Sequence, residues 1–104
     1  MDKKTLHNTV DTLSPILIDL SDKIWEFAEL SMQEFSSANY YITLLKKYGF
    51  SVEENLCGIQ TAFLGRFGEG KPVIGILGEY DALSNLSQQP NLPVKTPVSK
   101  DGCG

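Results

Sequence analysis

The stretch VIGILGEYDAL, residues 73–83, decides the fold because it leads an apolar strand directly into two carboxylates. If its first part is a strand, apolar residues lie on both faces, which is typical of a central strand covered by helices. The alternation of side chains along a strand predicts that Glu79 and Asp81 lie on one side of the strand and Tyr80 on the other. We therefore expect a strand over about 72–79 within an α/β sheet.

A long first helix is predicted at the start of the chain. Apolar residues recur at a regular four-three spacing from Leu6 to Phe27, which predicts an amphipathic helix over about 3–30. Pro15 lies inside this pattern. It either kinks the helix or starts a second helical segment at that segment's first position.

The periodicity then indicates a second helix and two further strands. A second apolar stripe predicts a helix over about 35–48 that ends at Gly49, a residue favoured after helix ends. Beyond it the apolar period changes to two, which predicts strands over about 50–54 and 60–67. With the strand at 72–79, this gives two helices followed by a mixed sheet of about three strands.

This α/β architecture is incomplete as it stands. A strand that is apolar on both faces needs a neighbour along each edge and helices on each face, and two helices with three strands do not supply them. We assign the whole chain, 1–104, to part of one domain. Its last segment, the loop 84–104, holds three of the five prolines and no periodicity, and loops of this length are usually functional or disordered.

Composition excludes several classes of protein. The net charge is -4 and the nine basic residues are scattered, so neither nucleic acid nor an anionic membrane is an expected partner. The chain starts with no apolar signal region, and no apolar stretch approaches the roughly 18 residues of a membrane span. Two cysteines, Cys57 and Cys103, are too few for a disulfide scaffold. We therefore expect a cytoplasmic protein.

Two groups of residues are candidates for a functional site, and their chemistry alone leaves the function open. Glu79 and Asp81 end a strand, where ligands gather in α/β sheets, but they could equally begin an exit loop. Cys103, in GCG, offers a soft thiolate ligand, and flanking glycines would let the backbone approach an ion. One cysteine is not a metal site, and the single histidine, His7, is predicted on the exposed side of the first helix.

A family resemblance adds to these observations. The strings IWEFAELSMQEFSSANYYITLLKKYGFSVE and GIQTAFLGRFGEGKPVIGILGEYDAL, followed by LSQ and a final GCG, resemble the start of the aminoacylase-type metallopeptidases. These are the amidohydrolases of metallopeptidase family twenty, and the resemblance covers roughly 20–104. It implies the N-terminal portion of an αβα-sandwich, zinc-peptidase-like catalytic domain. The implied activity is hydrolysis of the amide bond of an N-acyl or p-aminobenzoyl amino acid.

The resemblance also implies roles for single residues. Cys103 matches a ligand of a two-metal centre, and the family has a histidine ligand two residues after that cysteine. Asp81 matches an aspartate that supports the metals, whereas Glu79 stands where sister branches have a metal-binding histidine. Two positions depart from the pattern: Ser84 replaces a proline, and Asp101 stands where a histidine often precedes the cysteine motif.

Cofactors and partners follow from the same resemblance. The family binds two divalent ions, zinc, manganese or nickel, and its general base and remaining ligands lie downstream of the residues matched here. We therefore expect the chain by itself to bind no ion and to be inactive. The expected partners are a small acyl-amino-acid substrate and a second subunit, identical or different. The alternative is a truncated, non-catalytic structural or protein-interaction module.

Overall fold

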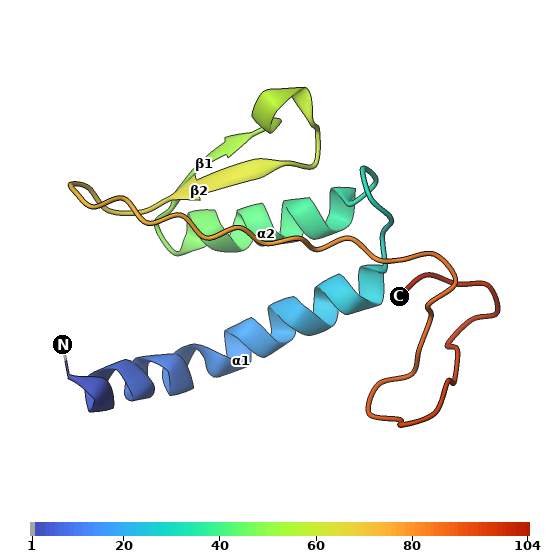
Figure 1. Ribbon diagram of the computed structural model, residues 1–104. Coiled ribbons are helices and arrows are strands. Elements are labelled where there is room, and N and C mark those ends of the chain that lie inside the picture. Colours follow the sequence, from blue (N-terminus) through green and yellow to red (C-terminus); the bar gives the residue numbers. More distant parts are fainter. Residues whose placement is uncertain (1) are drawn as a thin grey trace.

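The computed structural model describes residues 2–104 and places two helices before a two-stranded antiparallel sheet (Figure 1). The elements, in chain order, are α1 (Lys3–Phe27), α2 (Phe35–Lys47), β1 (Ser51–Glu54), a single 3-10 turn (Leu56–Gly58) and β2 (Phe63–Arg66). The expectation of a partial α/β domain, with its helices before its strands, is confirmed by this order.

The first helix, α1, begins and ends at identifiable caps. The Asp2 carboxylate accepts a hydrogen bond of 2.7 Å from the amide of Thr5, which satisfies one free donor of the first turn. Ala28 adopts a left-handed conformation (φ 43°) and ends the helix, so the predicted end near residue 30 is too late. Pro15 lies inside one continuous helix and does not divide it. Within residues 2–104, no helix combines the length and apolarity that crossing a membrane requires.

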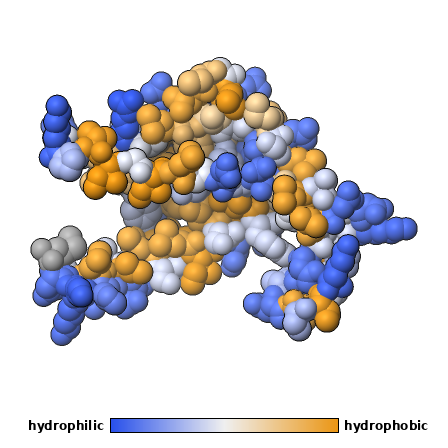
Figure 2. Space-filling model, in the orientation of Figure 1, coloured by the Kyte–Doolittle hydropathy of each residue, from blue (hydrophilic) through white to orange (hydrophobic). Residues whose placement is uncertain are grey.

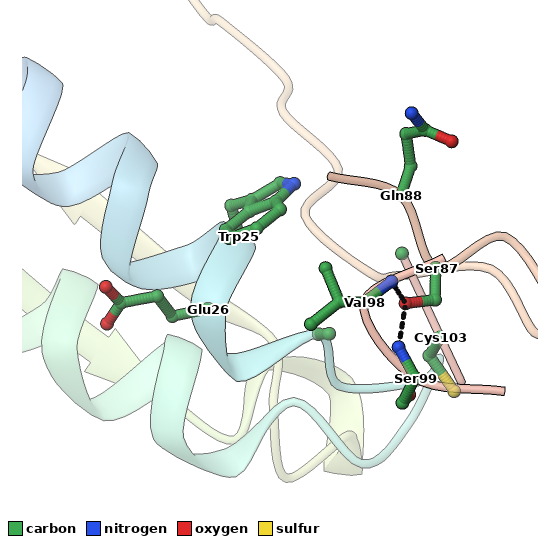
Figure 3. A pocket seen from close by; sticks show the side chains of 9 residues that line it. Trp25, Glu26, Ser87, Gln88, Val98, Ser99 and Cys103 are labelled. Atoms are coloured by element: carbon green, nitrogen blue, oxygen red, sulfur yellow. Dashed lines mark hydrogen bonds between the residues drawn. The ribbon is translucent and has the colours of Figure 1, made fainter. Parts of the chain in front are cut away.

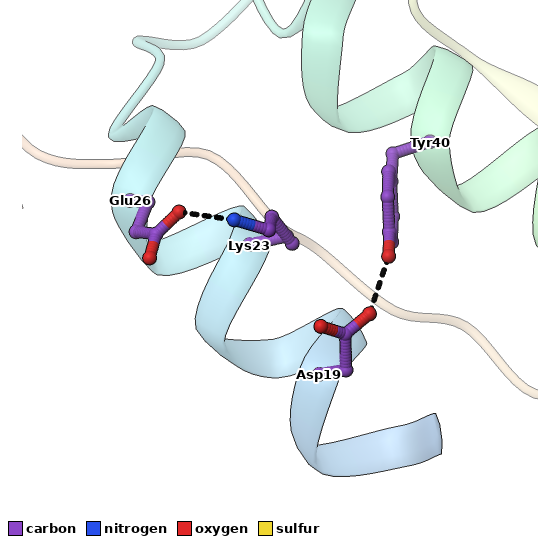
Figure 4. Close-up of polar contacts among 4 residues, drawn as sticks. All are labelled: Asp19, Lys23, Glu26 and Tyr40. Atoms are coloured by element: carbon purple, nitrogen blue, oxygen red, sulfur yellow. Dashed lines mark hydrogen bonds and ion pairs between the residues drawn. The ribbon is translucent and has the colours of Figure 1, made fainter. Parts of the chain in front are cut away.

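Polar and aromatic contacts join α1 to α2. The Tyr40 hydroxyl on α2 donates a hydrogen bond to the Asp19 carboxylate on α1 (Figure 4). The rings of Phe27 and Tyr40 meet edge to face with centroids 6.3 Å apart. Lys23 and Glu26 form an ion pair along α1 at 2.7 Å, also drawn in Figure 4. The two helices form one layer, and α2 lies between α1 and the hairpin (Figure 1).

The hairpin of β1 and β2 packs on α2. Gly49 takes a positive φ of 85° and turns the chain out of α2, as its position predicts. The strands pair antiparallel, with Ser51 opposite Arg66. A Cβ atom on Gly65 would come within 3.1 Å of Leu45, so the lack of a side chain lets β2 approach the helix closely. The predicted strands at about 50–54 and 60–67 are therefore found, both somewhat shorter.

The strand predicted over about 72–79 is absent, and the expectation of about three strands is wrong for this chain. The segment runs from β2 to the C-terminal loop without strand pairing (Figure 1). Its large side chains are almost fully exposed, at 86% for Val73, 82% for Ile74, 95% for Ile76 and 92% for Leu77. Strand geometry persists only where neighbouring strands take up the backbone donors and acceptors, and β1 and β2 pair only with each other.

The buried core is small for a chain of this length. The buried apolar side chains of the described residues are Leu20, Ala38 and Ile42. The accessible surface is 8446 Å², against about 5,800 Å² expected for a folded monomer of 11.5 kDa. The radius of gyration is 16.3 Å, against about 13 Å for a compact domain of this size. Apolar side chains accordingly lie open over much of the face shown in Figure 2.

Candidate functional site

Three segments that are distant in the sequence meet where GEYDAL ends. The amide of Ala82 donates to the carbonyl of Glu29 at 2.8 Å, and Leu30 and Ala82 form an isolated parallel bridge. Leu83 and Gly104 exchange both backbone hydrogen bonds, at 2.8 and 3.1 Å. Residues 82 and 83 therefore lie between the α1–α2 connection and the GCG segment. The ends of the two candidate segments, GEYDAL and GCG, are therefore next to each other in space.

The candidate side chains are accessible. Glu79 and Asp81 are exposed while Tyr80 between them is partly buried. Cys103 is half-buried and free, and Cys57 is exposed and free. Among residues 2–104, no three His, Cys, Asp or Glu side chains come together as a group that could hold a metal ion.

Tyr80 anchors the GEYDAL stretch to the hairpin. Its hydroxyl donates a hydrogen bond to the carbonyl of Thr61, and its ring lies 6.0 Å from that of Phe63, centroid to centroid. Burial raises the pKa of Tyr80, and the negative charges of Glu34 and Glu29 raise it further, against a smaller lowering by the bond to Thr61. The phenol therefore stays protonated at neutral pH and remains a donor.

Glu29 connects the same region to α2, a role that the sequence analysis missed. Its carboxylate accepts hydrogen bonds from the amides of Ser36 and Ser37, at 2.9 and 2.8 Å. Burial alone raises the pKa of Glu29, but the amides of Ser37 and Ser36 outweigh it, and the pKa lies below its ordinary value. The carboxylate thus caps a helix whose own N-cap residue, Glu34, makes no side-chain capping bond.

A cavity of about 240 Å³ opens beside Cys103 (Figure 3). Trp25 and Glu26, at the end of α1, line one side of it. The opposite side comes from the C-terminal loop and includes Ser87, Val98 and Cys103. Cys103 therefore lies at the margin of a space that combines an indole ring with polar groups.

The structure places the end of GEYDAL next to GCG, and both strings are among those that resemble a class of amidohydrolases and peptidases. Comparison with known proteins bears this out. The chain is 44% identical over 90 residues to one subunit of the p-aminobenzoyl-glutamate hydrolase of Escherichia coli K12, covering 83% of this chain and 19% of that protein. The resemblance to this hydrolase family is thereby confirmed.

Two carboxypeptidases of Saccharolobus solfataricus give the same result. Thermostable carboxypeptidase 1 is 30% identical over 95 residues, covering 89% of this chain and 24% of that protein. Thermostable carboxypeptidase 2 is 34% identical over 80 residues, covering 75% of this chain and 20% of its own length. No family model matches the chain, and no solved structure matches it significantly. The chain thus spans about a fifth to a quarter of the length of these relatives.

Proposed function

We propose that these residues form the N-terminal part of a cytoplasmic, metal-dependent amidohydrolase. Its substrate would be an N-acyl or p-aminobenzoyl amino acid, cleaved at the amide bond. The observation that carries the proposal is the pairing of Leu83 with Gly104, which sets the segment bearing Asp81 beside the segment bearing Cys103. The relatives support it, because they are named as a hydrolase of p-aminobenzoyl-glutamate and as carboxypeptidases.

Roles for the two residues follow from their chemistry and from the register of this pairing. Cys103 would supply one thiolate ligand to a divalent ion (zinc, manganese or nickel), with the other ligands outside residues 2–104. In the antiparallel register, the residue after Gly104 would face Ala82, next to Asp81. The resemblance expects a histidine ligand there, and Asp81 would support the ion site from the neighbouring segment. A bound ion would polarise the scissile carbonyl and activate water.

The test uses the intact protein that contains these residues. It is assayed with each divalent ion for release of free amine from p-aminobenzoyl-glutamate and from N-acetyl amino acids. Cys103→Ala should lose metal and activity together, whereas Asp81→Asn should lower turnover and retain metal. Cys57→Ala, at the exposed second cysteine, is the matched control and should keep both. Full activity in Cys103→Ala, or no hydrolysis of either substrate class, would refute the proposal.

A non-catalytic module is the second candidate, and the exposed apolar segment at 73–77 favours it. Such a surface suits association with another chain. One relative is named as a subunit of its enzyme, which suggests pairing of subunits in the catalytic proposal as well. Metal binding separates the two candidates: an intact protein that forms a stable complex but binds no divalent ion supports the module.

A further inference from the structure

Ser87, the middle residue of LSQ, makes contacts that the roles above do not use. Its side chain is 7% exposed, and its hydroxyl oxygen accepts hydrogen bonds from the amides of Val98 and Ser99 at 3.1 and 3.3 Å (Figure 3). Its own amide donates to the carbonyl of Gly102 at 3.2 Å. Ser87 therefore joins the start of the C-terminal loop to Val98 and Ser99 through its side chain, and to Gly102 through its backbone.

Gln88 continues this network on the other side of the loop. Its side-chain carbonyl accepts a hydrogen bond from the amide of Thr96 at 2.8 Å. Its side-chain amide donates to the carbonyls of Gln89 and Val94, at 3.1 and 3.0 Å. The amide of Gln89 also donates to the carbonyl of Thr96 at 2.8 Å. The Gln88 side chain thus closes the segment 89–96 into a loop of fixed shape.

The glycines on either side of Cys103 fit the same contact. A Cβ atom on Gly104 would lie 2.4 Å from the carbonyl oxygen of Leu86, closer than any real contact. A Cβ atom on Gly102 would lie 3.1 Å from the Cβ of Ser87. The flanking glycines therefore let the GCG backbone pack directly on Leu86 and Ser87, a role that the sequence analysis had given to an approaching ion.

We infer that Ser87 and Gln88 are positioning residues that hold Cys103 at the margin of the cavity beside Trp25. The two polar side chains fix the loop, and the loop places Cys103 next to the segment that contains Leu83. The backbone hydrogen bonds between Leu83 and Gly104 hold the two segments together. Buried hydrogen bonds of this kind lock the conformation of groups that have little apolar packing. The catalytic meaning of this inference rests on the proposed function, whereas the positioning itself does not.

The test reads the position of Cys103 directly. In a Cys57→Ser background, Cys103 is labelled with bimane, which tryptophan quenches on contact, and Trp25 is the only tryptophan of the chain. Trp25→Phe establishes how much quenching comes from that residue. Ser87→Ala should raise the population of the open loop about fivefold and reduce the quenching, because a typical hydrogen bond is lost. Ser84→Ala, exposed on the same segment, is the matched control and should leave it unchanged.

Gln88→Ala provides a second variant if Ser87→Ala fails to fold, and circular dichroism checks the helices in each. Quenching that equals the parent in both variants overturns the inference. In the intact hydrolase, Ser87→Ala should lower kcat about tenfold with KM little changed, as loss of a supporting residue around a metal ligand does. Reduced quenching in a protein that hydrolyses nothing would refute the proposed function and leave the positioning of the thiol standing.

Discussion

The hydroxyl of Tyr80 donates a hydrogen bond to the carbonyl of Thr61 and so ties the GEYDAL stretch to the turn before β2. Thr61 is buried, at 5% exposure, whereas residues 73–79 are exposed and have no strand partner among residues 2–104. The bond from Ala82 to Glu29 holds the same stretch two residues later. The position of Asp81 therefore depends on two polar anchors that flank it.

Tyr80→Phe should loosen the first anchor and retain the ring packing against Phe63. Loss of one partly buried hydrogen bond costs about 1 kcal/mol in the free energy of unfolding, measured by urea denaturation. Amide exchange at Ala82 should also become faster, since its segment is less restrained. Tyr48→Phe, at a 40% exposed tyrosine, is the control. Equal destabilisation by both substitutions would argue against this role of the Tyr80 hydroxyl.

Glu29→Gln should destabilise α2 and change how stability depends on pH. Loss of the charged cap costs about 1 kcal/mol near neutral pH. The folded state holds the pKa of Glu29 below its ordinary 4.5, so this stabilisation is complete above 4.5 and is lost as pH falls through the lower folded pKa. Urea denaturation should be measured from about pH 2 to about pH 7, a range that spans this transition. Glu29→Gln should lose less stability at acid pH than the parent does.

Glu69→Gln is the control for this series, because Glu69 is an exposed glutamate in the turn after β2. Its pH profile should follow that of the parent. If Glu29→Gln also follows the parent, its carboxylate does not cap α2 in solution.

Gly104→Ala should separate GCG from LSQ. The added Cβ atom meets the backbone of Leu86, which has no flexible side-chain end that could move aside. We expect faster amide exchange at Leu83, whose N–H donates to Gly104, with little change at amides of α2. Gly75→Ala is the matched control, because nothing lies within 4 Å of the added atom there. Unchanged protection of Leu83 in Gly104→Ala would contradict the observed backbone contact.

The sequence predicted the parts of the fold that local patterns determine. Helix periodicity and Gly49 located both helices, and the period of two located the hairpin strands. The end of α1 was placed too late because Ala28 takes a left-handed conformation. Residues other than glycine rarely adopt it, so an alanine gives no signal for a helix end. The strand at 72–79 depends on partners distant in sequence, and its apolar pattern could not show that they are missing among residues 2–104.

The sequence analysis named the candidate side chains but not the contacts that hold their segments in place. Asp81 and Cys103 were identified from the strand end and from the glycine-flanked cysteine. The contact between their two segments depends on the pairing of Leu83 with Gly104, which leaves no periodic signal in a proline-rich loop. Glu29 and Ser87 act through backbone amides 7 to 12 residues away in sequence, and such contacts carry no fixed motif.

The exposed apolar segment at 73–77 should make the 104-residue chain self-associate. An extended stretch with unpaired backbone groups and side chains more than four-fifths exposed is a template for pairing with another strand. Ile74→Lys combined with Ile76→Lys places two charges on one face of this stretch and should prevent such pairing. Sedimentation velocity over a range of concentrations should show a rising mean mass for the parent and a monomer for the double variant.

The control for this prediction lies on another exposed apolar surface, the stripe of α1. Leu6 and Val10 are 52% and 53% exposed, so Leu6→Lys with Val10→Lys adds the same charge on a helix. Because a helix has no unpaired backbone donors along its length, this second pair should leave strand-mediated association unchanged. A parent chain that stays monomeric at every concentration would contradict the prediction. Loss of association only in the Leu6 and Val10 variant would assign it to α1.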